Sequence, residues 1–197
     1  MGQVSPDSRF GRAIIETLRG MDIQSVCEVG AWNGQGTTSC LFAGISGRPI
    51  QLYSLEGDPS MYAQAASAWA GIQNVHMIYG TLHRNVMSRQ AVMSHPLFNK
   101  IKPHYDLWYK TEEETCMRAP LVGVPKCDCI LLDGGEFSTQ GDWDVLKHSQ
   151  LKVVMLDDTQ VIKTNAIRDL LLRSSEWTCT HDEPNDRNGW SIFVLTR

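Results

Sequence analysis

The stretch Ser25-Val26-Cys27-Glu28-Val29-Gly30-Ala31-Trp32-Asn33-Gly34-Gln35-Gly36 decides the fold of this chain of 197 residues. A β-prone run with an acid near its end is followed at once by a glycine-rich turn, and a helix-like run follows that turn. Strand, turn and helix in this order form a ligand site at the carboxyl end of a parallel strand. The glycines let ligand and backbone approach closely, because they have no Cβ.

The glycine spacing of this turn differs from that of the dinucleotide-binding fingerprint G-x-G-x-x-G, whose glycines begin directly after the strand. Counted from Gly30, that fingerprint requires glycine at 32 and 35, where tryptophan and glutamine stand. The pattern here is E-x-G-x-x-x-G-x-G, and its acid is Glu28. An acid at this position would repel a pyrophosphate but would suit a cationic ligand such as an amino group. A glycine loop without a ligand is the alternative.

The composition indicates one modest domain, which we expect to span 1–197. The net charge of -4 disfavours a nucleic-acid partner, and no apolar run is long enough to span a membrane. The polar N-terminus has no signal-peptide core. The six cysteines form no C-x-x-C pair, and Cys27 and Cys129 fall inside apolar runs. We therefore expect reduced core thiols and a cytoplasmic location.

Helices and strands alternate along the chain, which predicts a doubly wound, mostly parallel α/β sheet. The expected strands cover 25–29, 50–55, 74–79, 128–132, 152–156, 177–181 and 190–196. The expected helices cover 9–18, 36–45, 60–70, 84–94, 140–148 and 161–173. Asp7 or Ser8 can cap the first helix, and Asp58 before Pro59 can cap the third.

A long connection at about 83–126 interrupts this rhythm. Its middle, 95–109, mixes prolines, aromatics and charges. Connections of this length are usually functional or disordered, and the aromatics argue against disorder. Two interpretations stay open: a lid or wall over a ligand site, and a contact between copies of the chain in a homo-oligomer.

A second candidate site follows the second strand. Glu56 ends that strand about 20 residues after the glycine turn, where an acid can accept hydrogen bonds from two ribose hydroxyls. Gly57 follows it, and Asp58 is better explained as the helix N-cap. Gly80 and Thr81 close the third strand in the same way. The alternative for Glu56 is a solvated acid at a strand end.

A third candidate site combines Asp133 with Asp157 and Asp158, which follow two short apolar strands. In a doubly wound sheet these strand ends are neighbours. Carboxylates that meet there repel one another unless a proton or a cation intervenes, and Mg²⁺ is the natural oxygen-ligated cation. The alternative is that Asp133 is only a strand-end acid and that Asp157 or Asp158 caps the following helix.

These motifs together resemble the class I S-adenosylmethionine (SAM)-dependent methyltransferases, whose first motif has this acid and these glycines. The D-G-x-[E/H] element that begins at Asp133, with the later Asp-Asp pair, looks like the metal-assisted small-molecule O-methyltransferases of the catechol, macrocin, rhamnosyl and cephalosporin-related types. The resemblance covers the chain from about residue 20 to its end, apart from the long connection. It implies a seven-stranded Rossmann-like sheet whose last strand runs antiparallel.

The resemblance implies methyl transfer from SAM to a hydroxyl of a small molecule or glycan, preferably a sugar, with Mg²⁺ or Mn²⁺ as a candidate second cofactor. The SAM-binding residues that it implies are Glu28, Gly30, Ala31, Trp32, Asn33, Gly34, Glu56, Gly57, Gly80, Thr81 and Asp133. The implied metal ligands are Asp133, Asp157 and Asp158, and the candidate catalytic groups are Glu136 and Asp158.

Two features depart from the family pattern. Glu136 stands three residues after Asp133, where the family usually has a His or Lys base, and Ser149-Gln150-Leu151 replaces the usual proline-glycine turn before strand five. Two other functions stay open beside the methyltransferase. An NAD-dependent oxidoreductase is disfavoured by Glu28 and by the glycine spacing, and a non-catalytic nucleotide-binding module would leave the acidic residues purely structural.

Overall fold

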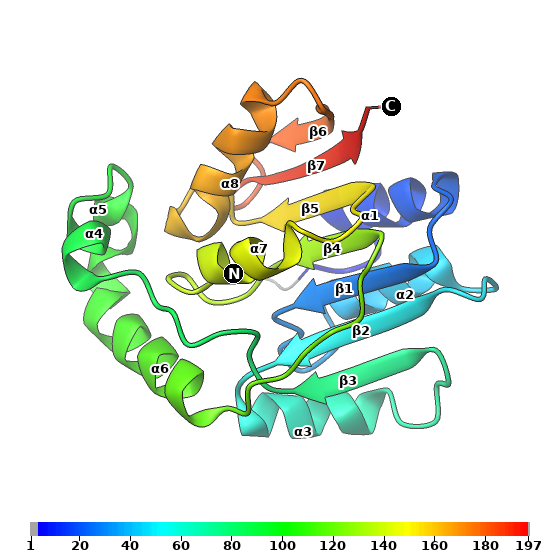
Figure 1. Ribbon diagram of the computed structural model, residues 1–197, viewed down its shortest axis with the longest axis horizontal. Coiled ribbons are helices and arrows are strands. Elements are labelled where there is room, and N and C mark those ends of the chain that lie inside the picture. Colours follow the sequence, from blue (N-terminus) through cyan, green and yellow to red (C-terminus); the bar gives the residue numbers. More distant parts are fainter. Residues whose placement is uncertain (1–3, 197) are drawn as a thin grey trace.

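The computed structural model describes residues 4–196, which form a seven-stranded sheet in the order β3-β2-β1-β4-β5-β7-β6 (Figure 1). The strands are β1 (Ser25–Val29), β2 (Gln51–Glu56), β3 (Val75–Tyr79), β4 (Cys129–Leu132), β5 (Val153–Asp157), β6 (Trp177–Glu183) and β7 (Trp190–Leu195). The pairs among β1 to β5 are parallel, and β7 runs antiparallel to both β5 and β6. The predicted fold class is therefore confirmed.

Two helices, α1 and α3, begin where the capping residues predict. The structure has α1 (Arg9–Gly20), α2 (Thr37–Ile45), α3 (Pro59–Ala68), α4 (Arg89–Met93), α5 (Phe98–Ile101), α6 (Tyr105–Arg118), α7 (Thr139–Leu146), α8 (Ile162–Arg173) and a short 3-10 helix over Lys102–His104. Ser8 caps α1 by accepting a hydrogen bond from the Gly11 N–H. Asp58 caps α3 through the N–H groups of Ser60 and Met61.

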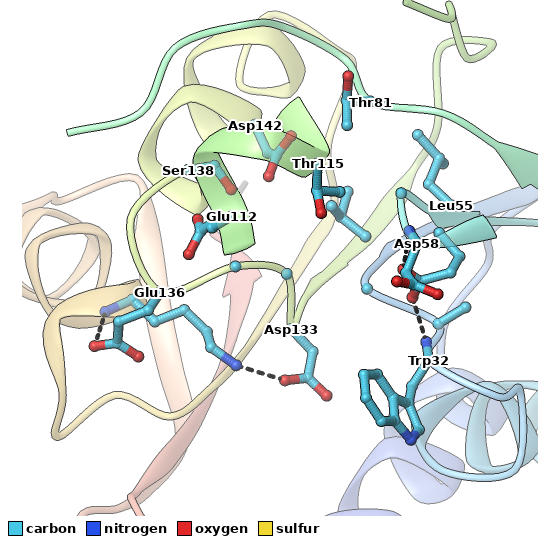
Figure 2. Close-up of a pocket in the computed structure, with 18 of the residues that line it drawn as sticks. Trp32, Leu55, Asp58, Thr81, Glu112, Thr115, Asp133, Glu136, Ser138 and Asp142 are labelled. Atoms are coloured by element: carbon cyan, nitrogen blue, oxygen red, sulfur yellow. Dashed lines mark hydrogen bonds and ion pairs between the residues drawn. The ribbon is translucent and has the colours of Figure 1, made fainter. Parts of the chain in front are cut away.

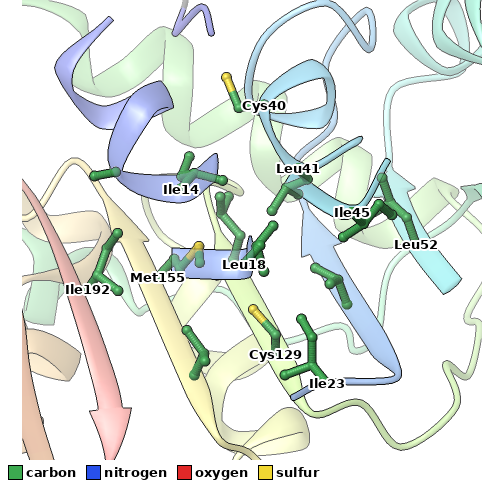
Figure 3. Packing of buried hydrophobic residues seen from close by; sticks show 14 of the residues in the cluster. Ile14, Leu18, Ile23, Cys40, Leu41, Ile45, Leu52, Cys129, Met155 and Ile192 are labelled. Atoms are coloured by element: carbon green, nitrogen blue, oxygen red, sulfur yellow. The ribbon is translucent and has the colours of Figure 1, made fainter. Parts of the chain in front are cut away.

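Two apolar layers bury the sheet. On one face, residues of α1 and α2 such as Leu18 and Leu41 pack over Cys129 and Met155 of the central strands (Figure 3). The other face is covered by a cluster that includes residues of α7 and α8. Because β4 and β5 are buried on both faces, their sequences are continuous apolar runs rather than alternating ones.

The long connection is mostly helical and lies beyond the carboxyl ends of the parallel strands (Figure 1). The helix expected over 84–94 is shorter than predicted, because Ser88 accepts a hydrogen bond from the Ala91 N–H and starts α4 there. The Arg84 side chain instead donates to the carbonyls of Cys116 and Ala119, 2.6 Å away in the second case. The 14-residue helix α6 was not predicted.

Thr81, just before the connection, pairs with Leu121 near the end of the connection. Thr81 forms a parallel bridge with Leu121, through the hydrogen bonds Thr81 N–H to Pro120 O (2.9 Å) and Val122 N–H to Thr81 O (3.0 Å). Residues of the connection also form a small apolar cluster with Phe137, which precedes α7, and with Val161 and Ile162 at the start of α8. That cluster comprises Val92, Ile101, Tyr105, Tyr109, Phe137, Val161 and Ile162.

Within residues 4–196, no helix has both the length and the apolar character needed to cross a membrane. The cysteines of this part of the chain are free thiols, and five of the six are buried. The expectation of unpaired core thiols therefore agrees with the structure.

Candidate functional site

A cavity of about 780 Å³ opens at the carboxyl ends of β1, β2 and β4 and is bounded on its far side by α6. This volume lies within the range of small-molecule and cofactor sites. Most of the predicted site residues line it: Gly30, Ala31, Trp32, Glu56, Gly57, Gly80, Thr81, Asp133 and Glu136. Each of the three candidate sites therefore contributes to one cavity, although Asp157 and Asp158 of the third site lie outside its lining.

The glycine turn after β1 is fixed between two neighbouring strands. The N–H groups of Gly30 and Ala31 both donate to the Leu55 carbonyl, at 3.0 and 2.9 Å. Gly30 has φ 91°, and a Cβ there would lie 2.3 Å from the Asp133 carbonyl oxygen. Only glycine satisfies both conditions, so this residue lets the β1 and β4 loops close against each other.

Glu28 lies beneath the turn and is fully buried. Its carboxyl group accepts hydrogen bonds from Thr37 Oγ1 (2.6 Å), Thr38 Oγ1 (2.7 Å) and the Ser54 hydroxyl. Burial raises the pKa of Glu28. It does not line the cavity, and its hydrogen bonds tie α2 and β2 to β1; contact with a ligand amino group stays a prediction.

Asn33 and Gly34, two other predicted ligand residues, also lie outside the cavity lining. Asn33 Oδ1 accepts a hydrogen bond from the Gln35 N–H and so shapes the turn. The Gly34 carbonyl accepts from Trp69 Nε1 at 2.8 Å, and a Cβ on Gly34 would lie 2.7 Å from that nitrogen. Asn33 thus shapes the turn from within, and Gly34 lets the turn pack closely against Trp69.

Glu56 ends β2 and lines the cavity, as predicted. Its Oε2 accepts from the Trp32 N–H and its Oε1 from the Asp58 N–H, both at 2.7 Å (Figure 2). Burial raises the pKa of Glu56, although these N–H groups oppose the shift. The carboxylate is therefore held rigidly where a ligand can reach it.

The predicted neighbours Asp133, Asp157 and Asp158 do meet, and we call them the carboxylate cluster. One oxygen of each lies within 4.8 Å of the others. Lys163, on the first turn of α8, reaches into this cluster: its Nζ is 2.9 Å from Asp133 Oδ1 and 2.7 Å from Asp158 Oδ2. Figure 2 shows the first of these contacts as the dashed line that ends at Asp133.

Asp157, the third member of the cluster, pairs with a different cation: Arg187 Nη2 lies 3.0 Å from Asp157 Oδ2. Although burial opposes ionisation, Lys163 lowers the pKa of Asp158. Burial and the charges of Asp133 and Asp158 raise the pKa of Asp157 to about 7. The oxygen donors suit Mg²⁺, but protein cations already hold all three side chains, so the cluster as folded does not fit a divalent ion.

Glu136 projects from the loop after β4 and lines the cavity. Its Oε1 accepts from the Ile162 N–H at 2.7 Å and from the Lys163 N–H at 3.3 Å, so it stabilises the first turn of α8. Burial raises its pKa to about 7, although Lys163 opposes the shift. This value suits a general base at neutral pH.

Backbone strain is concentrated around this site. Among residues 4–196, the non-glycine residues with positive φ are Trp32 (52°), Asp158 (57°) and Arg187 (58°). Trp32 and Arg187 line the cavity, and Asp158 is paired with Lys163. Strained non-glycine residues persist where the surroundings over-determine them, and such positions cluster at functional sites.

Sequence reasoning missed several groups that line the cavity. Lys163 could have been found, because it stands near the start of the predicted helix that follows the Asp-Asp pair. Glu112 lies on the unpredicted helix α6, and its Oε1 accepts from the Phe137 N–H at 2.8 Å. His83 and Asp142 form a buried pair with Nε2 and Oδ1 3.1 Å apart, and no local pattern joins these two positions.

No protein-family model matches this sequence, and the search of curated proteins gives no match. Solved structures are similar. A SAH-bound methyltransferase of Podospora anserina, PaMTH1, superposes with a TM-score of 0.60 at 13% identity, over 95% of this chain and 78% of that one. An O-methyltransferase of Bacillus cereus in complex with SAH gives 0.59 at 14% identity, over 94% and 80%.

A third structure carries the donor itself. The O-methyltransferase TomG of Streptomyces achromogenes, involved in tomaymycin synthesis and in complex with SAM, gives a TM-score of 0.54 at 16% identity, over 95% of this chain and 79% of that one. Likeness at this level of identity is a likeness of fold. The chain therefore has the Rossmann-like fold of these methyltransferases.

Proposed function

We propose that this protein transfers the methyl group of SAM to a hydroxyl of a small molecule. One observation carries the proposal: the rigid acid Glu56 and the pair Glu136 and Lys163 line the same cavity on a methyltransferase fold. Glu56 is placed to bind a ribose, and Glu136 and Lys163 are placed to accept the proton of a hydroxyl and to stabilise the charge on its oxygen.

The donor fits the side of the cavity beneath the glycine turn. The ribose hydroxyls of SAM donate to Glu56, and Thr81 lies at the adenine side. Asp133, at the edge of the turn, faces the cationic methionine end. SAM carries a positive sulfonium that becomes neutral on transfer, so an acidic cavity attracts the donor more strongly than the product.

The acceptor fits beside Glu136 and Lys163. Its oxygen attacks the methyl carbon in line with the C–S bond, the C–S electron pair stays on sulfur, and the hydroxyl proton moves to Glu136. Catalysis comes from positioning the two reactants and from removing this proton. The base prediction for Glu136 is thus retained, whereas Asp158, predicted as a second catalytic group, is assigned to holding Lys163.

For the acceptor class we propose a sugar hydroxyl. Trp32 and Trp108 line the cavity with 55% and 42% of their surface exposed, so flat apolar faces stand near charged groups. A sugar ring presents C–H faces to such indoles and hydroxyls to Glu136 and Lys163. A panel of sugars, catechols and other alcohols, assayed for methyl transfer from labelled SAM, tests this choice. Turnover of catechols without sugars contradicts it.

Calorimetry with SAM, SAH and NAD separates the candidate functions. Binding of SAM and SAH without NAD supports the methyltransferase, whereas NAD binding alone supports an oxidoreductase. Tight SAM binding without turnover of any acceptor supports a non-catalytic nucleotide-binding module. The glycine spacing and the methyltransferase fold favour the first outcome.

A further inference from the structure

We propose that the Lys163 ammonium is the resident cation of the carboxylate cluster, so that methyl transfer requires no divalent metal. Lys163 would also contact the acceptor oxygen directly. The catalytic half of this inference rests on the proposed function. The half that concerns the cation does not, because metal binding can be measured without any turnover.

The position of Lys163 is fixed by its helix. Glu136 binds the backbone N–H groups of Ile162 and Lys163, and the Ile162 side chain is buried in the apolar cluster beneath the long connection. The Lys163 side chain is itself only 10% exposed. From this anchored turn its ammonium extends to two members of the cluster, at 2.7 and 2.9 Å.

Charge compensation supports the same conclusion. The three carboxylates of the cluster are paired with Lys163 and Arg187, which leaves at most one uncompensated negative charge when all are ionised. Mg²⁺ binds carboxylate oxygens at about 2.0–2.1 Å, so an ion among these three side chains would lie beside the Lys163 ammonium. Asp158 Oδ1 has no hydrogen-bond partner among the described residues, but an ion that used it would be repelled by the buried lysine that holds Asp158 Oδ2 and Asp133 Oδ1.

The geometry also gives Lys163 a part in the reaction. An ammonium has three N–H donors, and two of them are directed at Asp133 and Asp158. Because Lys163 lines the cavity, the third can donate to an acceptor oxygen. As the proton of the hydroxyl moves to Glu136, the developing negative charge on that oxygen is stabilised by the ammonium, which stays protonated throughout.

Titration with Mn²⁺ tests the cation directly, by electron paramagnetic resonance on the purified chain. We expect no Mn²⁺ binding by the wild type up to about millimolar concentration, in the range of weak protein cation sites. Lys163→Met removes the charge, leaves the carboxylates, and should gain Mn²⁺ binding. Lys163→Arg keeps the charge and should not gain it. Lys147→Met, at an exposed ion pair with Asp144, is the matched control and should behave as the wild type.

Micromolar Mn²⁺ binding by the wild type overturns the proposal, and so does a folded Lys163→Met variant that gains no binding. If Lys163→Met does not fold, the wild-type and Lys163→Arg titrations still decide the question. On the activity side, turnover should persist in excess EDTA, and Lys163→Met should lower kcat about 10²-fold with SAH affinity unchanged.

Loss of turnover in EDTA that Mg²⁺ restores also overturns the proposal. A protein that binds neither SAM nor SAH instead refutes the proposed function and the catalytic half of the inference. The Mn²⁺ titration then still tests whether Lys163 is the resident cation. The two failures are therefore distinguishable.

Discussion

Glu28 and Glu56, beneath the glycine turn, are held by hydroxyl and backbone N–H groups, whereas the carboxylate cluster at β4 and β5 is held by Lys163 and Arg187. The two acidic regions share one edge of the sheet but differ in the charge of their partners. Neutral donors fix the shape of the first region. In the carboxylate cluster, charged partners keep ion pairs beside the part of the cavity where we propose that methyl transfer occurs.

The largest expected effect is on stability, at Glu28. Glu28→Ala removes the acceptor of three buried hydroxyls, and we expect the free energy of unfolding to fall by about 3 kcal/mol or more in urea denaturation. Glu28→Gln keeps an acceptor in the same place and should cost much less. If Glu28→Ala is as stable as the wild type, these hydrogen bonds do not shape the region.

Next comes the base. Glu136→Gln keeps the shape of the side chain and removes its basicity, so kcat should fall by about 10²-fold or more, equivalent to about 2.7 kcal/mol. SAH affinity, measured by calorimetry, should be unchanged. Glu114→Gln, a partly exposed acid on α6, serves as the control. A near-normal kcat for Glu136→Gln would move the base role to another group.

A smaller effect is expected at the proposed ribose site. Glu56→Ala should weaken SAH binding by about 2 kcal/mol, or roughly 30-fold, because two ribose hydroxyls lose a charged acceptor. Asp58→Ala removes the cap of α3 beside the same cavity, so its main cost should be about 1 kcal/mol of stability. Equal loss of SAH affinity in both variants would contradict a ribose contact made by Glu56 alone.

The smallest expected effect is the pH dependence. With its pKa raised to about 7, Glu136 is mostly protonated at pH 6, so kcat there should be about tenfold below its alkaline plateau. Because the pKa of Glu136 is higher in the folded than in the unfolded chain, protonation of Glu136 stabilises the folded state. This stabilisation is fully present below pH 4.5 and is lost as the pH rises through about 7. Both trends should disappear in Glu136→Gln, and a flat rate profile in the wild type would contradict the assignment.

The strands of the sheet could be predicted from the sequence, because short apolar runs between turn residues indicate strands that are buried on both faces. It also located Glu56 and the carboxylate cluster, since strand ends on one edge must meet. It failed at α6, whose apolar residues are too few and irregular to show a helical stripe. The helix packs partly through aromatic contacts between Tyr105, Tyr109 and Phe137, which no local pattern reveals.

The partners of the predicted acids could not be obtained from local sequence either. The pattern indicated that Asp133, Asp157 and Asp158 meet and that a proton or a cation must then intervene, but it could not identify Lys163 as a partner. That answer depends on the direction of α8, which is fixed by Phe137, Val161 and their neighbours in a separate apolar cluster. Tertiary packing determines which cation pairs with these carboxylates, whereas motif spacing predicts only that the carboxylates meet.

The bridge between Thr81 and Leu121 has a consequence for how this protein could change over generations. The segment from 82 to 120 begins and ends beside this bridge, so its two ends lie side by side. Loops whose ends are already joined can lengthen, shorten or be exchanged at small entropic cost, while the strands beneath keep their register. On the proposed function, exchange of this one segment would replace Trp108 at the acceptor side and leave Glu56 at the donor side in place.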